Sequence, residues 1–176
     1  MAVELHKDAM TEEEFRLLKD VIYEHCGIHF RDDMRFLLER RLLPRLRFHR
    51  LENFGEYYRF LRFNTLRKDE LEAAVEALTT NETYFFREPN QLQAFTEEVL
   101  PQLAEEKARS RRLRIWSAGC SSGEECFTIA MLLLESGRFE GWDVEVLGTD
   151  ISRKMLATAR TGHYGASAFR STDPAV

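Results

Sequence analysis

Apolar residues recur every three or four positions through residues 11–80, a spacing typical of helices that bury one side. The first run follows Thr11 and Glu14, which have the spacing of a capping box, and Gly27 is expected to end it. Asn53 is a suitable cap for a later helix. The remaining amphipathic runs occupy residues 34–50, 53–63 and 67–80. The pattern predicts a compact unit of four helices with a core of Phe, Tyr and Leu.

The run MRFLLERRLLPRLRFHR at residues 34–50 contains six arginines and a single acid, Glu39. On a helical wheel the leucines gather on one side and most of the arginines on the other. Like charges four positions apart destabilise a helix, so this face indicates an acidic partner, although a solvated charged face is the plainer interpretation. Pro44 is expected to kink the helix or make it restart, because a proline removes a helical hydrogen bond. The arginines on the polar side are Arg40, Arg41, Arg45 and Arg47.

The pattern changes in the second half of the chain. Residues 88–112 predict a long polar-faced helix with Pro89 in its first turn. Two short apolar runs, Leu113–Ser117 and Val144–Gly148, predict strands, and a helix is predicted after each of them. These helices occupy residues 124–135 and 152–160. A strand, a glycine-containing loop, a helix and a second strand that stops at an acid form half of a nucleotide-binding α/β sheet.

The loop WSAGCSSGEE at residues 116–125 is the main candidate for chemistry. It lacks the Gly-Lys-Ser/Thr ending of a phosphate-binding P-loop, and its two glycines have the wrong spacing for a dinucleotide fingerprint. Glu124 and Glu125 would repel a pyrophosphate and favour a cationic ligand, but complementation of the helix dipole explains them equally well. Asp150 follows the second strand, where an acid can accept both hydroxyls of a ribose. A ligand that contains a ribose and a positive charge and that approaches the backbone closely suggests S-adenosyl-L-methionine.

Composition and charge narrow the class of protein. With 176 residues, of which 44% are hydrophobic and 31% charged, the chain has globular composition and room for one domain or two small ones. No apolar run reaches the roughly 18 residues of a membrane span, and the first ten residues do not resemble a secretory signal. We therefore expect a cytoplasmic protein without metal, in which Cys26, Cys120 and Cys126 are reduced. The net charge of −5 argues against nucleic acid as a partner.

Three stretches, in order and with sensible spacing, resemble the chemotaxis receptor methyltransferase family, CheR. They are ALTTNETYFFRE at 77–88, RIWSAGCSSGEECFTIAM at 114–131 and LGTDIS at 147–152. The resemblance implies an all-helical N-terminal domain, residues 1–88, followed by the first half of a Rossmann-like class I S-adenosylmethionine-dependent methyltransferase domain, residues 89–176. It also implies methyl transfer from S-adenosyl-L-methionine, which becomes S-adenosyl-L-homocysteine, to glutamate side chains on the cytoplasmic helices of chemoreceptors.

The resemblance implies roles for individual residues. Asp150 matches the ribose-binding acid of the family, and Glu125 matches the acid after the glycine loop. Asn81, Thr83 and Arg87 match cofactor ligands in the segment that connects the two domains. Arg87 would pair with the methionyl carboxylate or, alternatively, act in catalysis by steadying the incoming glutamate. The implied receptor-binding positions are Arg41, Arg45 and Arg47.

Several features leave alternatives open. The polar run at residues 79–83 is also compatible with a capped helix start. Pro44 stands where relatives tend to be basic, and only two strands of the larger sheet of a class I methyltransferase are found, so we expect a family member cut short. A non-catalytic module that docks its arginine helix on an acidic partner is the second hypothesis. The third hypothesis is RNA methylation, which is disfavoured because a chain with a net negative charge does not attract the phosphates of RNA.

Overall fold

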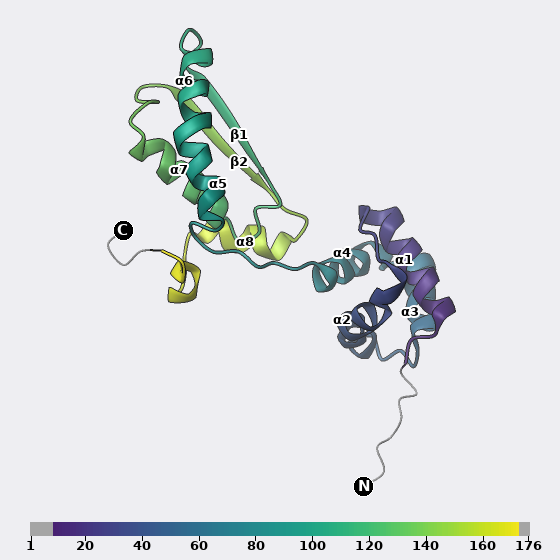
Figure 1. Ribbon diagram of the computed structural model, residues 1–176. Coiled ribbons are helices and arrows are strands. Elements are labelled where there is room, and N and C mark those ends of the chain that lie inside the picture. Colours follow the sequence, from purple (N-terminus) through teal and green to yellow (C-terminus); the bar gives the residue numbers. More distant parts are fainter. Residues whose placement is uncertain (1–8, 173–176) are drawn as a thin grey trace. The chain divides into compact units, whose positions relative to one another are not determined.

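The computed structural model describes residues 9–172 of the chain (Figure 1). Residues 1–8 and 173–176 lie outside the described part, and so does most of the stretch, the first ten residues, on which the expectation about a secretory signal rests. The chain divides into two compact units, Met1–Thr80 and Asn81–Val176. The sequence predicts this boundary at residue 88, whereas the structure assigns residues 81–88 to the second unit.

The first unit is built from four α-helices within the described residues, as the apolar spacing predicts. Two of the predicted caps are confirmed at their ends. Thr11 and Glu14 form a reciprocal capping box, with the Thr11 hydroxyl 3.2 Å from the Glu14 amide nitrogen, and Gly27 ends the helix with a left-handed φ of 76°. The helices are α1 (Glu12–Cys26), α2 (Arg35–Phe48), α3 (Phe54–Phe63) and α4 (Arg67–Leu78), and the 3-10 turn η1 (Asp32–Met34) precedes α2.

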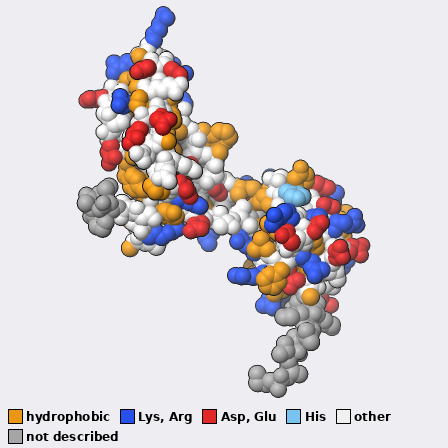
Figure 2. Space-filling view, viewed as in Figure 1, with side chains coloured by type: hydrophobic (Ala, Val, Ile, Leu, Met, Phe, Trp, Pro, Cys, Tyr) orange, Lys and Arg blue, Asp and Glu red, His pale blue; other side chains and the backbone are white. Residues whose placement is uncertain are grey.

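Helix α2 continues through Pro44 as a single α-helix, so of the two predicted alternatives the restart is wrong, and the kink stays a prediction. Its leucines Leu38, Leu42 and Leu46 are all buried in the core of the unit. Packing of this apolar side stabilises the helix and offsets the hydrogen bond that the proline removes. Figure 2 shows basic, acidic and hydrophobic side chains mixed on the visible face of this unit, rather than a uniform positive face.

After residues 81–88, the second unit continues with a helical run that the sequence predicts as one helix. The structure divides it into α5 (Pro89–Ala94), a π-helical turn η2 (Phe95–Val99) and α6 (Leu100–Lys107). In the π turn the Leu100 amide donates to the Phe95 carbonyl, five residues back. Pro101 follows directly, and its ring would clash with the carbonyl four residues before it in a regular α-helix. The wider turn therefore accommodates the proline without ending the helical run.

A pair of parallel strands forms the centre of the second unit and confirms both strand predictions. In β1 (Arg112–Ala118) and β2 (Asp143–Thr149), Arg112 lies opposite Asp143 and Ala118 opposite Thr149. The elements after the strands are α7 (Glu124–Glu135), α8 (Arg153–Thr161) and the 3-10 turn η3 (Ala166–Phe169). Because both strands end at the same edge, the loop after β1 and the acid after β2 meet there.

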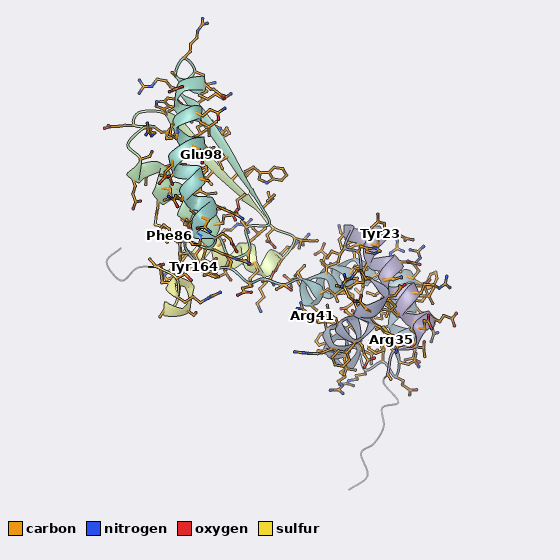
Figure 3. The ribbon with its side chains drawn as sticks, viewed as in Figure 1. Tyr23, Arg35, Arg41, Phe86, Glu98 and Tyr164 are labelled. Atoms are coloured by element: carbon orange, nitrogen blue, oxygen red, sulfur yellow. The ribbon has the colours of Figure 1, made fainter. Side chains whose placement is uncertain are left out.

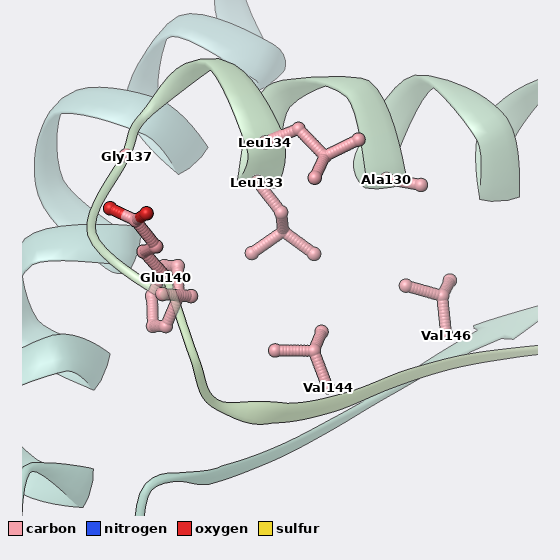
Figure 4. Close-up of a pocket in the computed structure, with 8 residues that line it drawn as sticks. Ala130, Leu133, Leu134, Gly137, Glu140, Val144 and Val146 are labelled. Atoms are coloured by element: carbon pink, nitrogen blue, oxygen red, sulfur yellow. The ribbon is translucent and has the colours of Figure 1, made fainter.

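An apolar pocket of about 470 Å³ lies between the C-terminal half of α7 and the first half of β2 (Figure 4). Among the described residues, Glu140 is the one ionisable side chain that lines it. The pocket lies away from the carboxyl ends of the strands, so it is no candidate for a nucleoside site. Its lining residues are Ala130, Leu133, Leu134, Gly137, Phe139, Glu140, Val144 and Val146. Within residues 9–172, no helix has the length and apolar character needed to cross a membrane.

Candidate functional site

The loop after β1 is folded by residues in the left-handed region of backbone space. Gly119 and Gly123 have φ of 88° and 96°, and Ser121 has φ of 47°. A side chain at Gly123 would meet the Ala159 Cβ at 3.0 Å, so this glycine allows α8 to pack closely. At Gly119, by contrast, no described atom beyond its two neighbours in the chain lies within 4 Å of the position that a Cβ would occupy, so only its φ requires glycine. The backbone at Gly119 is therefore open to a ligand.

Asp150 is oriented by the same loop. Its Oδ2 accepts from the Ser121 amide at 2.7 Å and its Oδ1 from the Ser152 amide at 2.8 Å. A carboxylate has about four acceptor positions, so each oxygen can accept a further hydrogen bond. The carboxylate is thus held in place by two backbone donors and can still bind the hydroxyls of a ribose.

The two glutamates at the start of α7 have different environments. Glu124 is only 4% exposed and accepts from the Ser122 hydroxyl at 2.7 Å. Glu125 is exposed and accepts from the buried Ser117 hydroxyl at 2.6 Å. Both carboxylates lie at the positive end of the helix, which stabilises them. Glu125 remains available to a ligand with positive charge, whereas the buried Glu124 is hydrogen-bonded within the loop.

The segment 81–88 packs against this site, and no helix starts within the polar run 79–83, so the alternative of a capped helix start there is wrong. The Asn81 carbonyl accepts from the Ser121 hydroxyl at 3.2 Å, and the Phe86 amide donates to the Thr128 hydroxyl of α7 at 3.2 Å. Phe86 adopts the left-handed region with φ of 55°, as does Glu88 with φ of 58°, although neither is glycine. Figure 3 labels Phe86 and Tyr164, which both lie in the second unit. The segment is therefore fixed to the loop and to α7.

Arg87 lies on this segment with an exposed guanidinium group. Its Nη1 donates to the Glu82 carbonyl at 2.8 Å, and its Nε lies 3.7 Å from the Glu88 carboxylate. The guanidinium carbon lies 5.8 Å from the centre of the Tyr84 ring. Thr83 is half-buried. Arg87 thus retains donors for an anionic group.

Phe85 attaches the segment 81–88 to the 3-10 turn η3, near the end of the described chain. Its amide donates to the Ala168 carbonyl at 2.8 Å, and its ring stacks on Phe169 with a centroid distance of 4.6 Å. Tyr164 meets the Phe85 ring edge-on and donates to the Ser122 carbonyl at 2.7 Å. Sequence reasoning missed the roles of Ser121 and Tyr164. Only the place of Ser121 within the glycine loop could have indicated its role.

The arginines of α2 do not form the uniformly solvated face that the helical wheel predicts. Arg41 is half-buried and its Nη1 donates to the carbonyls of Leu78 and Thr79, at 3.1 and 2.8 Å, at the end of α4. Arg45 is also half-buried and forms an ion pair with Glu70. Arg40 and Arg47 are exposed. Arg41, which Figure 3 labels, and Arg45 are both implied receptor-binding positions, and both have partners inside their own unit.

Glu70 is the centre of a buried polar cluster in the helical unit. Its side chain is 3% exposed and accepts from the Arg45 Nε at 3.0 Å, the Tyr57 hydroxyl at 2.6 Å and His49 Nε2 at 2.5 Å. Burial, followed by the hydrogen bond to Glu70, raises the pKa of Tyr57. The hydrogen bond with Glu70 likewise raises the pKa of Arg45. The cluster joins α2, α3 and α4.

A parallel strand pair with a glycine loop and an oriented acid at its carboxyl edge defines a class, the α/β proteins that bind nucleosides or nucleotides there. The chain belongs to the CheR methyltransferase family. Residues 81–175 match the CheR methyltransferase SAM binding domain, and residues 13–79 match the CheR methyltransferase all-alpha domain. The family resemblance and the fold class expected from the sequence are thereby confirmed.

Similar proteins carry chemotaxis names. Chemotaxis protein methyltransferase 2 of Vibrio cholerae is 36% identical over 168 residues, which cover 95% of this chain and 58% of that protein. The chemotaxis protein methyltransferase of Borreliella burgdorferi is 38% identical, with coverage of 88% and 56%. That of Escherichia coli K12 is 36% identical, with coverage of 94% and 55%. The chain thus spans little more than half the length of these curated relatives.

Proposed function

We propose that this chain contributes a partner-binding helical unit and the first part of a cofactor site to an enzyme that methylates glutamate side chains. The cofactor is S-adenosyl-L-methionine, the product S-adenosyl-L-homocysteine, and the substrate the cytoplasmic helices of chemoreceptors. The observation that carries the proposal is Asp150, held by two backbone amides beside an open glycine loop, in a chain of the CheR family.

The residues at the strand ends fit the chemistry of this cofactor. Asp150 would accept the ribose hydroxyls, and the open backbone at Gly119 would allow close approach. Glu125 would stabilise positive charge, and Arg87 would pair with the methionyl carboxylate. Asn81 and Thr83 would supply further hydrogen bonds. When bound, the cofactor supplies a methyl group on a positively charged sulfur.

The substrate carboxylate needs little activation. A glutamate is ionised at neutral pH and is already a nucleophile, so the enzyme does not require a strong base. The protein must mainly align the attacking oxygen and keep water out of the site. Arg87, which retains free donors on an exposed side chain, is the residue that would orient an incoming carboxylate if it does not bind the cofactor.

Helix α2 is the proposed receptor-binding element of a cytoplasmic protein. Of the implied positions, Arg47 is exposed, whereas Arg41 and Arg45 are half-buried and part of each guanidinium group is engaged within the unit. The competing hypothesis is a non-catalytic module that docks α2 on an acidic partner. A methyl-transfer assay on receptor cytoplasmic fragments, run beside a pull-down on the same fragments, separates the two. Binding without transfer supports the module.

The cofactor site is tested by Asp150→Ala in a chain with the full length of these relatives. We expect S-adenosyl-L-homocysteine to bind about 1.5–3 kcal/mol more weakly by calorimetry, because hydrogen bonds to a charged group are lost. Asp143→Ala, which removes an exposed carboxylate at the opposite end of β2, is the matched control and should bind normally. Equal affinities for the two variants would remove Asp150 from the site. Arg87→Ala should also weaken binding, and an effect on turnover alone would assign Arg87 to the substrate.

A further inference from the structure

Two cysteine thiols meet against one glycine of β2, next to the candidate site. A Cβ atom placed on Gly148 would lie 2.6 Å from the Cys126 sulfur and 2.9 Å from the Cys120 sulfur. Cys120 belongs to the loop after β1, and Cys126 to the first turn of α7. The two sulfur atoms therefore pack side by side in the space that a side chain at residue 148 would fill.

The two thiols differ in their access to solvent. Cys120 is only 3% exposed, whereas Cys126 is half-buried. Burial, followed by the neighbouring Cys126 thiol, raises the pKa of Cys120 to about 11, which keeps Cys120 protonated. The accessible sulfur is thus the one that can react first, and the buried sulfur is placed to react second.

We propose that Cys120 and Cys126 form an oxidation site that a peroxide converts into a disulfide. The Cys126 thiolate attacks hydrogen peroxide, which breaks the O–O bond, releases hydroxide and leaves a sulfenic acid. The Cys120 sulfur then attacks the sulfenic sulfur, loses its proton and displaces the hydroxyl group as water. Overall, two thiols lose two hydrogens and the peroxide is reduced to two water molecules.

The disulfide would change the loop that holds Asp150. A sulfur–sulfur bond is about 2.05 Å long, which is shorter than the distance between two sulfur atoms in non-bonded contact. The two sulfurs must therefore move closer together when the bond forms. The Cys120 amide donates to the Thr149 carbonyl at 2.9 Å, and the next amide, that of Ser121, donates to Asp150. Movement of Cys120 toward α7 weakens these two bonds. The oxidation itself goes beyond the proposed function, and only its effect on cofactor binding depends on that function.

The sequence allows a clean test because it contains three cysteines. Cys26 lies in the helical unit, where its thiol donates to the Ile22 carbonyl, and it is the internal control. After treatment with hydrogen peroxide, non-reducing peptide mass spectrometry should show a link between the peptides of Cys120 and Cys126 and the loss of two hydrogens. Cys26→Ser should behave like the wild type, and Cys126→Ser should form no such link. Cys126 oxidised to the sulfinic acid without a link, or Cys26 oxidised first, would overturn the proposal.

A second measurement separates this inference from the proposed function. Amide hydrogen exchange in the loop and at Asp150 should become faster in the oxidised chain and recover on reduction with dithiothreitol. The oxidised full-length protein should bind S-adenosyl-L-homocysteine about tenfold more weakly, as for the loss of one hydrogen bond to a charged group. If the reduced protein does not bind it, the proposed function fails while the disulfide stands. If the link forms and loop exchange is unchanged, the proposed effect on the loop is wrong.

Discussion

Substitution of Glu70 tests whether its polar cluster stabilises the helical unit. Glu70→Gln keeps the shape of the side chain but leaves Arg45 without its counter-charge and weakens the bonds from Tyr57 and His49. Removal of one partner from a buried ion pair typically costs about 3–5 kcal/mol. Arg45 retains a side-chain exposure of 25%, so solvent relieves part of the cost and we expect about 3 kcal/mol.

Native-state hydrogen exchange measures this change in the intact chain. Peptides from α2, α3 and α4 should exchange faster by on the order of a hundredfold, the equivalent of about 3 kcal/mol. Both tryptophans, Trp116 and Trp142, lie in the second unit, so their fluorescence should report an unchanged unfolding transition there. Asp69→Asn changes an exposed neighbour on the same helix and should cost only about 0.5 kcal/mol. Equal effects of the two substitutions would show that the free-energy cost of burying Glu70 is as large as the stabilisation from its hydrogen bonds and ion pair.

The same cluster predicts that the stability of the helical unit depends on pH in the acidic range. Burial alone raises the pKa of Glu70, but hydrogen bonds from Arg45, Tyr57 and His49 outweigh it and hold the pKa below its ordinary value of 4.5. A carboxyl with a lowered folded pKa stabilises the protein above its unfolded pKa, and this stability is lost as the pH falls through the folded value. The helical unit of the wild type should therefore lose more stability below pH 4.5 than that of Glu70→Gln. Parallel acid curves for the two proteins would contradict this account.

The remaining predictions concern one residue in each unit. Gly148→Ala should destabilise the second unit by about 1–3 kcal/mol in tryptophan-monitored urea unfolding, because a Cβ there meets two sulfurs at less than 3 Å. At Gly165, no described atom beyond the two neighbours in the chain lies within 4 Å of a Cβ, so Gly165→Ala should change the stability of the second unit by less than about 0.5 kcal/mol. Arg41→Ala should lower the stability of the helical unit by about 1–2 kcal/mol, because the carbonyls at the end of α4 lose their donor, whereas exposed Arg40→Ala should not. Equal stabilities for Arg41→Ala and Arg40→Ala would refute the capping role.

The parts of the fold that local chemistry determines could be predicted from the sequence. The capping box at Thr11, the stop at Gly27 and the cap at Asn53 each depend on residues within a few positions of one another, and all three are present. Both strands are short apolar runs bounded by turn residues, and each extends only one residue beyond its prediction at either end. The contact between Asp150 and the glycine loop follows from the parallel pairing of these strands.

Long-range contacts explain what the sequence could not show. A helical wheel places Arg41 and Arg45 away from the leucines, but their acceptors are on α4, some 25 to 38 positions later in the chain. The same applies to the boundary between the units. Phe85 follows the helical unit directly, yet its amide is bonded to Ala168, and no local pattern reports that contact. The π turn before Pro101 also depends on how the helix accommodates the ring, which apolar spacing does not encode.

The attachment of Phe85 to Ala168 and Phe169 has a consequence for how such proteins diversify. It ties the beginning of the second unit to a segment near the end of the described chain, so the residues that line the candidate site are inherited as one closed block. A recombination point at residue 80 leaves this block intact, whereas one at residue 88 would separate Phe85 from its stacking partner. Helical units with different surface charges can therefore be exchanged at residue 80 without breaking the contacts of Phe85 that hold the candidate site together. Under the proposed function, the receptor-binding unit and the cofactor-binding unit can then diverge separately in one polypeptide.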